Sequence, residues 1–479
     1  MNSSKFTKYF GDAPFWRSIA QLALPIALQN LLSSSFSLVD TLMVGQLGDI
    51  PLSAVGMAGQ FGWFLSMILF GFTSGLSMFV SQYWGAQDRR SIHRVYGIAL
   101  TLACGSAAVF TAAGALLPRG VISIFNREAQ VLEVGSSYLA IAAFSYPAIA
   151  LNYIFMGVLR ATEQVKLPLC VTSVTTVLNG ILDYVLIFGV GPIPALGARG
   201  AAIATVISAW LSPMIIFIVS LCRKNILIAS PAEIFNFKGG YFPVFLRRAM
   251  PVVANETLWG AGTLVFNIIF SNLGAGNYAA VTIMRTFESI AFVFFVGLGN
   301  ASSVIVGKSV GAGDIDAAVR DSRRFSVLVP TFSLLLGTLI IIFSRQIVGI
   351  FDLGGTITED TLTTAVYILA IYAAEMPIRN IPYIMICGIF RPGGETKVGM
   401  KYDLMFLWLL SLPATLCAAF LFRLPFPAVF ATMYIAEDWL KAFFCVRYYL
   451  TGKWLKPVTP EGKRGLELYR AGVSASSKE

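Results

Sequence analysis

Long apolar stretches run through the whole chain, and short segments with charged residues, glycine or proline separate them. A helix that crosses a bilayer needs about 20 mostly apolar residues. Stretches of this kind lie near 18–46, 52–83, 92–117, 135–159, 167–190, 200–222, 246–273, 278–306, 325–349, 361–389, 398–422 and 427–449. The pattern therefore predicts twelve transmembrane helices.

Composition strengthens this interpretation. Hydrophobic residues make up 56% of the 479 residues and charged residues 13%, and the mean hydropathy is +0.74. A soluble protein has about 25% charged residues. We therefore expect an all-α polytopic membrane protein. Its N-terminus is polar and basic, and the first apolar stretch is longer than the core of a signal peptide, so no removable signal peptide is expected.

Lysine and arginine are unevenly distributed between alternate connections. Most of the 35 basic residues fall in the N-terminal tail, in every second connection and after Arg447. The other connections contain Arg119, Arg127, Arg199, Arg345 and Arg423. Because cytoplasmic loops are enriched in Lys and Arg, we expect both termini to be cytoplasmic. Basic loops facing anionic lipid explain the net charge of +10 without a nucleic-acid partner.

The second half of the sequence repeats the first. A shift of 226 positions aligns Ala23, Pro25 and Asp88 with Ala249, Pro251 and Asp314, and later a shift of 231 aligns Gly157, Arg160 and Lys166 with Gly388, Arg391 and Lys397. Each repeat holds six predicted helices, so both halves enter the membrane from the same side. This predicts two six-helix lobes related by a pseudo-two-fold axis along the membrane normal, with a cavity between them and alternating access by rocking.

The repeat also sets the expected domain boundaries. We predict a cytoplasmic N-tail (1–17), an N-lobe with helices 1–6 (18–222), a cytoplasmic linker (223–245), a C-lobe with helices 7–12 (246–450) and a cytoplasmic C-tail (451–479). Because one chain contains both lobes, a monomer is expected.

Several segments resemble one family of transporters. Pro25 precedes Asp40 by fifteen residues, and the motifs VGQLG, QYWGAQD, MGVLRATEQ (156–164), LNGILDYVLIFG (178–189), GARGAAIATVIS (197–208) and CGIFRPGGET (387–396) follow. From about residue 16 to 450, the chain resembles the multidrug and toxic compound extrusion (MATE) family. Asp40, Asn179 and Asp183 look like the arrangement of its DinF-type branch.

This resemblance implies a MATE-like fold and a secondary antiporter in a bacterial plasma membrane. Such proteins export organic, often cationic and aromatic, compounds in exchange for H⁺ or Na⁺. The expected partners are small organic substrates and membrane lipids, and no cofactor is expected. Pro25 and Pro251 are hinge candidates because proline interrupts helical hydrogen bonds; a position at a helix end is the alternative.

Acidic residues within predicted spans are functional candidates unless a partner neutralises them. Three have a basic residue three or four positions away, which predicts the pairs Glu288–Arg285, Glu375–Arg379 and Glu437–Lys441. Asp40, Asp183 and Glu256 have no such neighbour.

Helix geometry places two of these acids at one depth. At 1.5 Å per residue, Asp40 lies about 22 Å beyond Pro25, and Asp183 lies about 24 Å beyond Leu167. Asn179 precedes Asp183 by one turn, and Thr205 on the next helix could add a hydroxyl. Two carboxylates in an apolar cavity disfavour each other's ionisation, as a proton carrier requires. With the amide and hydroxyl oxygens they would also suit Na⁺.

The C-lobe acids are expected nearer the cytoplasm. Glu256 lies about 12 Å from the Arg247–Arg248 boundary, and Glu375 comes late in its helix. Acids at this depth would attract a cationic substrate. The family's seventh-helix glutamate lies farther beyond its proline than Glu256 lies beyond Pro251. For Glu256 we therefore favour substrate attraction over ion coupling.

Other functions fit the sequence less well. A flippase for lipid-linked oligosaccharides or peptidoglycan precursors, from the same superfamily, often has additional helices and a cationic cavity. An enzyme would need a catalytic motif, but the single histidine, His93, falls in a predicted inner loop, where we expect an ordinary surface residue. The six cysteines lack CxxC or metal-ligand spacing, so no metal site is predicted. A channel remains an alternative that sequence alone does not separate from a transporter.

Overall fold

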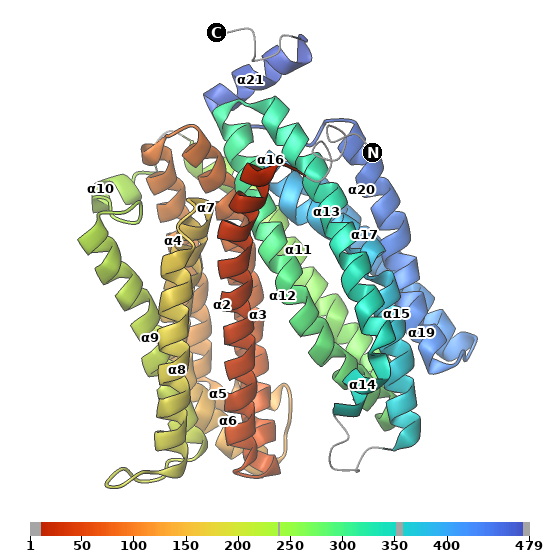
Figure 1. Ribbon diagram of the computed structural model, residues 1–479. Coiled ribbons are helices and arrows are strands. Elements are labelled where there is room, and N and C mark those ends of the chain that lie inside the picture. The colour runs from red at the N-terminus through yellow and green to blue at the C-terminus, as the bar shows by residue number, and fades with distance from the viewer. Residues whose placement is uncertain (1–10, 238–239, 351–357, 473–479) are drawn as a thin grey trace. The chain divides into compact units, whose positions relative to one another are not determined.

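The computed structural model describes residues 11–237, 240–350 and 358–472. Within these ranges the chain is helical, and its one β-type contact is an isolated bridge between Val190 and Ile193 (Figure 1). In lipid every backbone N–H and C=O group needs a partner within the protein, which helices provide.

The predicted class is confirmed: this is an all-α polytopic membrane protein. In the described residues, eleven helical segments are long and apolar enough to span a bilayer. They are Ala13–Gly45, Asp49–Gly85, Arg89–Leu116, Ala129–Ala161, Lys166–Phe188, Ala198–Arg223, Tyr241–Ser271, Gly276–Ala312, Ile315–Ile342, Glu359–Gly393 and Lys397–Leu421. The twelfth predicted span is also helical, from Phe426 to Leu450, but it carries Glu437, Asp438, Lys441 and Arg447.

Packing divides the chain into two compact units. Unit 1 comprises Met1–Leu24, Ser81–Gln87 and Ala254–Glu479, and unit 2 comprises Pro25–Val80 and Asp88–Val253. The chain changes unit immediately before Pro25 and two residues after Pro251. The lobe boundaries expected from the repeat follow the chain order and remain a prediction.

Unit 2 is built from the helices of the first half. They are α2 (Ala13–Gly45, from Pro25), α3 (Asp49–Gly85, to Val80), α4 (Arg89–Leu116), α5 (Pro118–Ser123), α6 (Ala129–Ala142), η1 (Ala143–Ser145), α7 (Tyr146–Ala161), α8 (Lys166–Phe188), α9 (Ala198–Arg223), α10 (Pro231–Ile234) and the start of α11 (Tyr241–Ser271). α8 packs against α9, α4 against α7, and α6 against α9.

Unit 1 contains most helices of the second half. They are the rest of α11, α12 (Ala275–Ala312), α13 (Ile315–Ile342), α14 (Ser344–Gly349), α15 (Glu359–Tyr383), η3 (Ile384–Phe390), α16 (Arg391–Gly393), α17 (Lys397–Phe406), η4 (Leu407–Ser411), α18 (Leu412–Leu416), η5 (Cys417–Leu421), α19 (Phe426–Tyr434), η6 (Ile435–Trp439), α20 (Leu440–Leu450) and α21 (Pro460–Arg470). The segments η3, η4, η5 and η6 are π-helical. η3 follows Pro382, whose missing N–H favours a local change of helical pitch.

The sequence repeat has direct structural counterparts. Asp88 caps α4 by accepting a hydrogen bond from the Ser91 N–H (3.1 Å), and Asp314 caps α13 by accepting one from the Ala317 N–H (2.9 Å). These are the same position of the two repeats. Aspartate is a favoured N-cap residue because its carboxylate satisfies a free N–H group of the first turn.

A reciprocal contact in unit 1 joins the ends of α3 and α12. A Cβ atom on Gly85 would lie 2.0 Å from the Lys308 carbonyl oxygen, and a Cβ on Gly311 would lie 1.9 Å from the Gln82 carbonyl oxygen. The shift of 226 converts each of these contacts into the other. Such reciprocity is the mark of a local two-fold relation, and it requires glycine at both positions.

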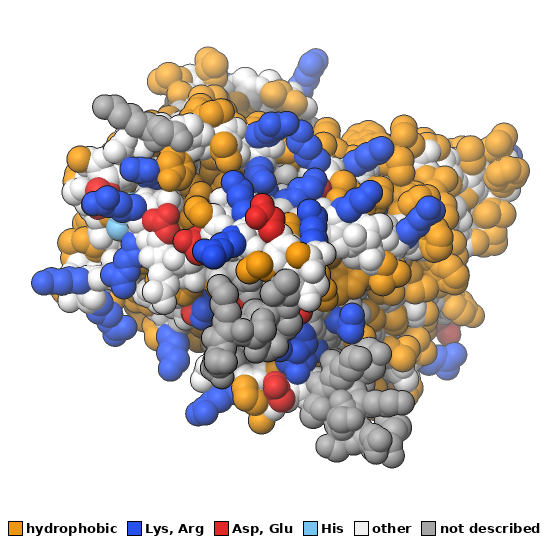
Figure 2. All heavy atoms as spheres, turned by 90° about the horizontal axis from the view of Figure 1, so that it is seen from above, with side chains coloured by type: hydrophobic (Ala, Val, Ile, Leu, Met, Phe, Trp, Pro, Cys, Tyr) orange, Lys and Arg blue, Asp and Glu red, His pale blue; other side chains and the backbone are white. Residues whose placement is uncertain are grey.

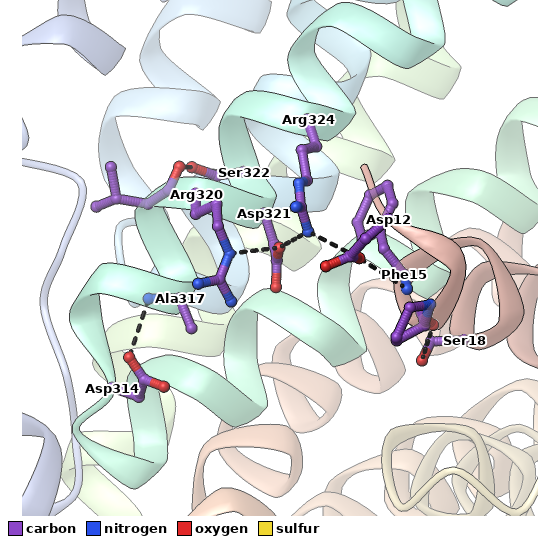
Figure 3. Close-up of polar contacts among 11 residues, drawn as sticks. Asp12, Phe15, Ser18, Asp314, Ala317, Arg320, Asp321, Ser322 and Arg324 are labelled. Atoms are coloured by element: carbon purple, nitrogen blue, oxygen red, sulfur yellow. Dashed lines mark hydrogen bonds and ion pairs between the residues drawn. The ribbon is translucent and has the colours of Figure 1, made fainter. Parts of the chain in front are cut away.

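The N-terminal end of α2 is attached to α13 within unit 1 (Figure 3). Asp12 accepts a hydrogen bond from the Phe15 N–H (3.2 Å) and lies 3.5 Å from Arg324 Nη1. Arg324 also binds Asp321 (3.1 Å) and lies over the Phe15 ring. The first turn of α2 therefore has a fixed partner in unit 1.

The segment that follows α20 folds back onto unit 1. The Val458 N–H donates to Gln82 Oε1 (2.8 Å), and Thr459 Oγ1 donates to the Gly311 carbonyl (2.7 Å). α21 lies at the end of unit 1 that faces the viewer in Figure 2, and Lys and Arg side chains are numerous on this face. This agrees with the basic side predicted from the sequence.

Glu395, in the loop between α16 and α17, accepts several hydrogen bonds at this end of unit 1. It accepts hydrogen bonds from Lys456, from the Tyr448 hydroxyl (3.1 Å) and from the Lys397 N–H (3.0 Å). Burial by itself raises the pKa of Glu395, but the hydrogen bonds from Lys456 and from the Val398 backbone outweigh it and hold the pKa below its ordinary value.

We expect Glu395→Gln to lower the stability of the protein by about 1–3 kcal/mol at neutral pH, toward the low end because Lys456 is half exposed. A lowered folded-state pKa gives stability that is present above the unfolded-state pKa of 4.5 and lost as pH falls through and below it. Thermal unfolding at pH 7 and pH 4 should therefore show a larger drop for wild type than for the variant. Glu467→Gln, on the exposed face of α21, is the control. An equal drop in wild type and Glu395→Gln would contradict this assignment.

Candidate functional site

The helices α2 and α8 bring Asp40 and Asp183 into electrostatic interaction inside unit 2. The Phe36 ring of α2 packs directly on Gly180 of α8, where a Cβ atom would lie 3.4 Å from the ring. Because Gly180 has no side chain, the two helices approach closely one turn before the acids. The two aspartates therefore lie close enough to interact, and their common depth in the membrane stays a prediction.

An apolar cluster surrounds the acids. Val44, Ile187 and Ala201 form a buried group, and Tyr138 and Leu47 pack against it. Val44 is one turn beyond Asp40, and Ile187 is one turn beyond Asp183. The carboxylates are consequently held at the edge of a water-poor region.

Within the described part of the chain, no basic side chain pairs with either aspartate. Asp183 is 0% exposed. Among the residues that the structure describes, both of its carboxylate oxygens and Asp40 Oδ1 are buried without a hydrogen-bond partner. An isolated buried carboxylate is strongly unfavourable, so each must bind a proton or a cation.

Tyr138 of α6 belongs to this site, although sequence reasoning missed it. Its hydroxyl contacts Thr205 of α9 and interacts electrostatically with Asp40 and Asp183. Thr205 Oγ1 donates to the Ala201 carbonyl (2.9 Å), which leaves its oxygen free to accept. A tyrosine in an apolar helix, in the segment SSY (136–138), was the available signal.

Asn179 is partly buried on α8, one turn before Asp183. Tyr138 and Thr205 bring two hydroxyl oxygens near the carboxylates. Such oxygens suit a proton or a hard monovalent cation, both of which oxygen ligands bind. In the described residues no group of three or more His, Cys, Asp or Glu side chains could hold a metal ion.

Glu256 requires a correction. The sequence showed no neighbour of opposite charge on its own helix, but Glu256 Oε1 lies 2.6 Å from Arg391 Nη2. Arg391 belongs to α16, far along the chain, so a search for pairs within one helix could not find it. The argument for Glu256 as an unpaired acid that attracts substrate is therefore removed.

Two of the three predicted helical ion pairs are also wrong. Glu288 pairs with Arg379 (2.7 Å) and not with Arg285, because α12 packs against α15. Glu375 instead accepts a hydrogen bond from Trp439 Nε1 (2.9 Å). The third prediction, Glu437–Lys441, is confirmed at 2.7 Å.

Lys441 also neutralises acids that the sequence analysis did not single out. Its Nζ lies 3.2 Å from Asp438 and 3.5 Å from Asp403, and Asp403 in turn accepts a hydrogen bond from Asn255. Lys441 is thus shared by three carboxylates of unit 1, whereas Glu375 is hydrogen-bonded to Trp439. Asp40 and Asp183 differ in that no basic side chain pairs with either of them among the described residues.

The remaining sequence expectations concern His93 and the two prolines. His93 is not a surface residue: it is buried on α4, with Nε2 3.0 Å from the Ile226 carbonyl and Nδ1 3.7 Å from Glu233. It therefore attaches the linker to α4.

Pro25 and Pro251 lie inside α2 and α11, so neither is at a helix end.

Comparison with known proteins points to one family. The MatE family model matches residues 25–185 and 251–434, so its two matches begin at the prolines that the repeat aligns. The probable multidrug resistance protein NorM of Thermotoga maritima is 26% identical over 94% of this chain and 96% of its own length. NorM of Burkholderia vietnamiensis is 26% identical over 84% of this chain and 86% of its own.

A solved structure shows the same fold. The Vibrio cholerae MATE transporter VcmN in the bent form matches with a TM-score of 0.81 and 20% identity, covering 92% of this chain and 97% of that one.

The different environments of Asp183 and Glu256 predict opposite effects on stability. Asp183→Asn removes an unpaired buried carboxylate and should raise the free energy of unfolding by about 1–3 kcal/mol. Glu256→Gln leaves Arg391 without its carboxylate and should lower it by about 3–5 kcal/mol. Thermal unfolding of both purified variants in sodium-free buffer measures the contrast. A loss of stability in Asp183→Asn as large as in Glu256→Gln would mean that Asp183 has a structural partner.

Proposed function

Because the chain belongs to the MatE family, we propose that it is a secondary antiporter that exports organic compounds in exchange for H⁺ or Na⁺ bound at Asp40 and Asp183. The observation that carries this proposal is the pair of interacting carboxylates without a protein partner in the described part of unit 2. The protein is a membrane transporter and not an enzyme.

The names of two relatives support small organic compounds as substrates. Those from Thermotoga maritima and Burkholderia vietnamiensis are named multidrug resistance proteins, which favours efflux of small organic compounds over the flippase alternative. We propose substrates that are often cationic and aromatic, with membrane lipids as the other partners. The chain works as a monomer in this proposal, because each half supplies one lobe.

The proposed coupling step is a change of charge in the apolar part of unit 2. When H⁺ or Na⁺ enters, the repulsion between Asp40 and Asp183 is relieved and their desolvation becomes less costly. Asp40 lies on α2, the helix that passes from unit 1 to unit 2 at Pro25. Relief of this repulsion would therefore let α2 change its path, with Pro25 as a hinge and Pro251 as its counterpart in α11.

The energetics are sufficient for concentrative export. One proton that moves down 100 mV releases about 2.3 kcal/mol. Since about 1.4 kcal/mol corresponds to a factor of ten, this supports roughly a 50-fold gradient of a neutral solute.

The proposed location follows from the charge of the connections between helices. We propose that the protein lies in a bacterial plasma (inner) membrane with both termini in the cytoplasm, where the basic connections face anionic lipid. With this orientation, we propose that the coupling ion reaches Asp40 from the outer medium.

The coupling ion can be tested with efflux of a fluorescent organic cation from proteoliposomes. Under an imposed pH gradient we expect export in wild type and a loss of at least tenfold in Asp40→Asn and Asp183→Asn. An imposed sodium gradient is the second arm and identifies Na⁺ if it alone drives export. Asp49→Asn, at an exposed position of α3, is the matched control. Wild-type export by the Asp40→Asn, Asp183→Asn double variant would exclude this site as the coupling site.

A further inference from the structure

The two halves of the chain contain the same polar contact, built with different charges. In unit 2, Gln29 Nε2 donates to Thr172 Oγ1 (2.8 Å), and Gln29 Oε1 accepts from Arg160 Nη2 (2.8 Å). In unit 1, Asn255 Nδ2 donates to Asp403 Oδ2 (3.1 Å), and Arg391 Nη2 donates to Glu256 Oε1 (2.6 Å). In the first half one side chain, Gln29, makes both contacts, and in the second half two adjacent residues, Asn255 and Glu256, share them.

These residues occupy equivalent positions of the repeat. The shift of 226 aligns Gln29 with Asn255 and Asn30 with Glu256, and the shift of 231 aligns Arg160 with Arg391 and Thr172 with Asp403. The amide contact is retained between the halves, as is the arginine. Both carboxylates of the second half are replaced by neutral side chains in the first.

The replacement leaves Arg160 without a negative partner. Among the described residues, Arg160 forms no ion pair with Asp or Glu, and its electrostatic partner is the Tyr153 hydroxyl. In the second half, Glu256 neutralises the equivalent arginine. Arg160 is only partly exposed, and its Nε atom is buried. A charge in such surroundings without a counter-charge is costly, and the cost is lowered when an anion binds to it.

The end of α7 offers only partial compensation. Arg160 lies in the last turn of this helix, where the carbonyl groups carry a partial negative charge worth about 0.3–1 kcal/mol to a nearby cation. These carbonyls help to keep the side chain charged. They do not bond to its Nε, which is buried without a hydrogen-bond partner in the described structure.

A second unsatisfied donor lies beside the first contact. Asn30 Nδ2 is also buried without a partner, and Asn30 is adjacent to Gln29, which holds Arg160. Asn30 occupies the position from which Glu256 reaches its arginine, but its side chain is one methylene group shorter. The Gln29 Oε1 acceptor is already engaged by Arg160. Two donors, Arg160 Nε and Asn30 Nδ2, therefore remain without acceptors in this half, beside a guanidinium that has no carboxylate partner among the described residues.

From this difference we propose that Arg160 and Asn30 form a binding site for a monovalent anion, either free chloride or the carboxylate of a transported compound. The anion supplies the negative charge that the Glu256 carboxylate supplies in the second half. It accepts from Arg160 Nε and Asn30 Nδ2 and neutralises the guanidinium. The site is separate from Asp40 and Asp183, which bind a cation, and does not depend on the proposed coupling mechanism.

The test is thermal unfolding of the purified full-length protein in nanodiscs, with sodium chloride replaced stepwise by sodium isethionate at constant ionic strength. We expect the Tm of wild type to rise with chloride. Asn30→Glu supplies the missing carboxylate. Its Tm in isethionate should therefore already exceed the Tm of wild type, and its apparent affinity for chloride should be at least tenfold weaker than that of wild type. Asn272→Glu, the same substitution at an exposed position, is the control and should keep the wild-type response.

Sodium benzoate forms the second arm and distinguishes the two sources. A wild-type response to chloride that Asn30→Glu loses identifies a free halide, and a response confined to benzoate identifies a substrate carboxylate. No response to either anion, or the same response in wild type and Asn30→Glu, overturns the proposal. If Asn30→Glu does not fold, Arg160→Gln replaces it, and retention of the wild-type anion response in that variant equally overturns the site.

Discussion

The absence of water from the bilayer core is the constraint on which the structure depends. It requires every backbone polar group to be satisfied within the chain, and helices meet this requirement along all eleven candidate spans. The same constraint applies to side chains: a charge in a span must find a partner, bind an ion or lose its charge. The distribution of paired and unpaired charges therefore separates the residues that maintain the fold from those available for transport.

The two halves of the repeat have resolved this constraint differently. In unit 1, Arg391 pairs with Glu256, Arg379 with Glu288, and Lys441 with Glu437. Unit 2 contains Asp40 and Asp183 without a neutralising group and Arg160 without an acid among the described residues. The repeat gives both halves equivalent helices, and the charged positions on these helices differ between the halves. Uncompensated charge is what mobile ions and ionised substrates can use.

Several contacts show how much the local sequence can predict. The capping aspartates Asp88 and Asp314 follow from their position before an apolar stretch, and Glu437–Lys441 follows from helical spacing. The repeat shows glycine at both positions 85 and 311. Only the fold explains why, because two helix backbones come into contact there. Where helices cross, a partner can come from any part of the chain.

The sequence by itself determined the helical class, the spans, the repeat and the pair Asp40 and Asp183, because hydrophobic periodicity and the rarity of intramembrane acids are local properties. Only the tertiary structure decided which charges are neutralised. Glu256 and Glu288 met partners on other helices, His93 became buried against the linker, and Tyr138 joined the acid pair. The reason is physical: an ion pair needs a separation of a few ångströms, and positions far apart in sequence reach that distance only when helices pack.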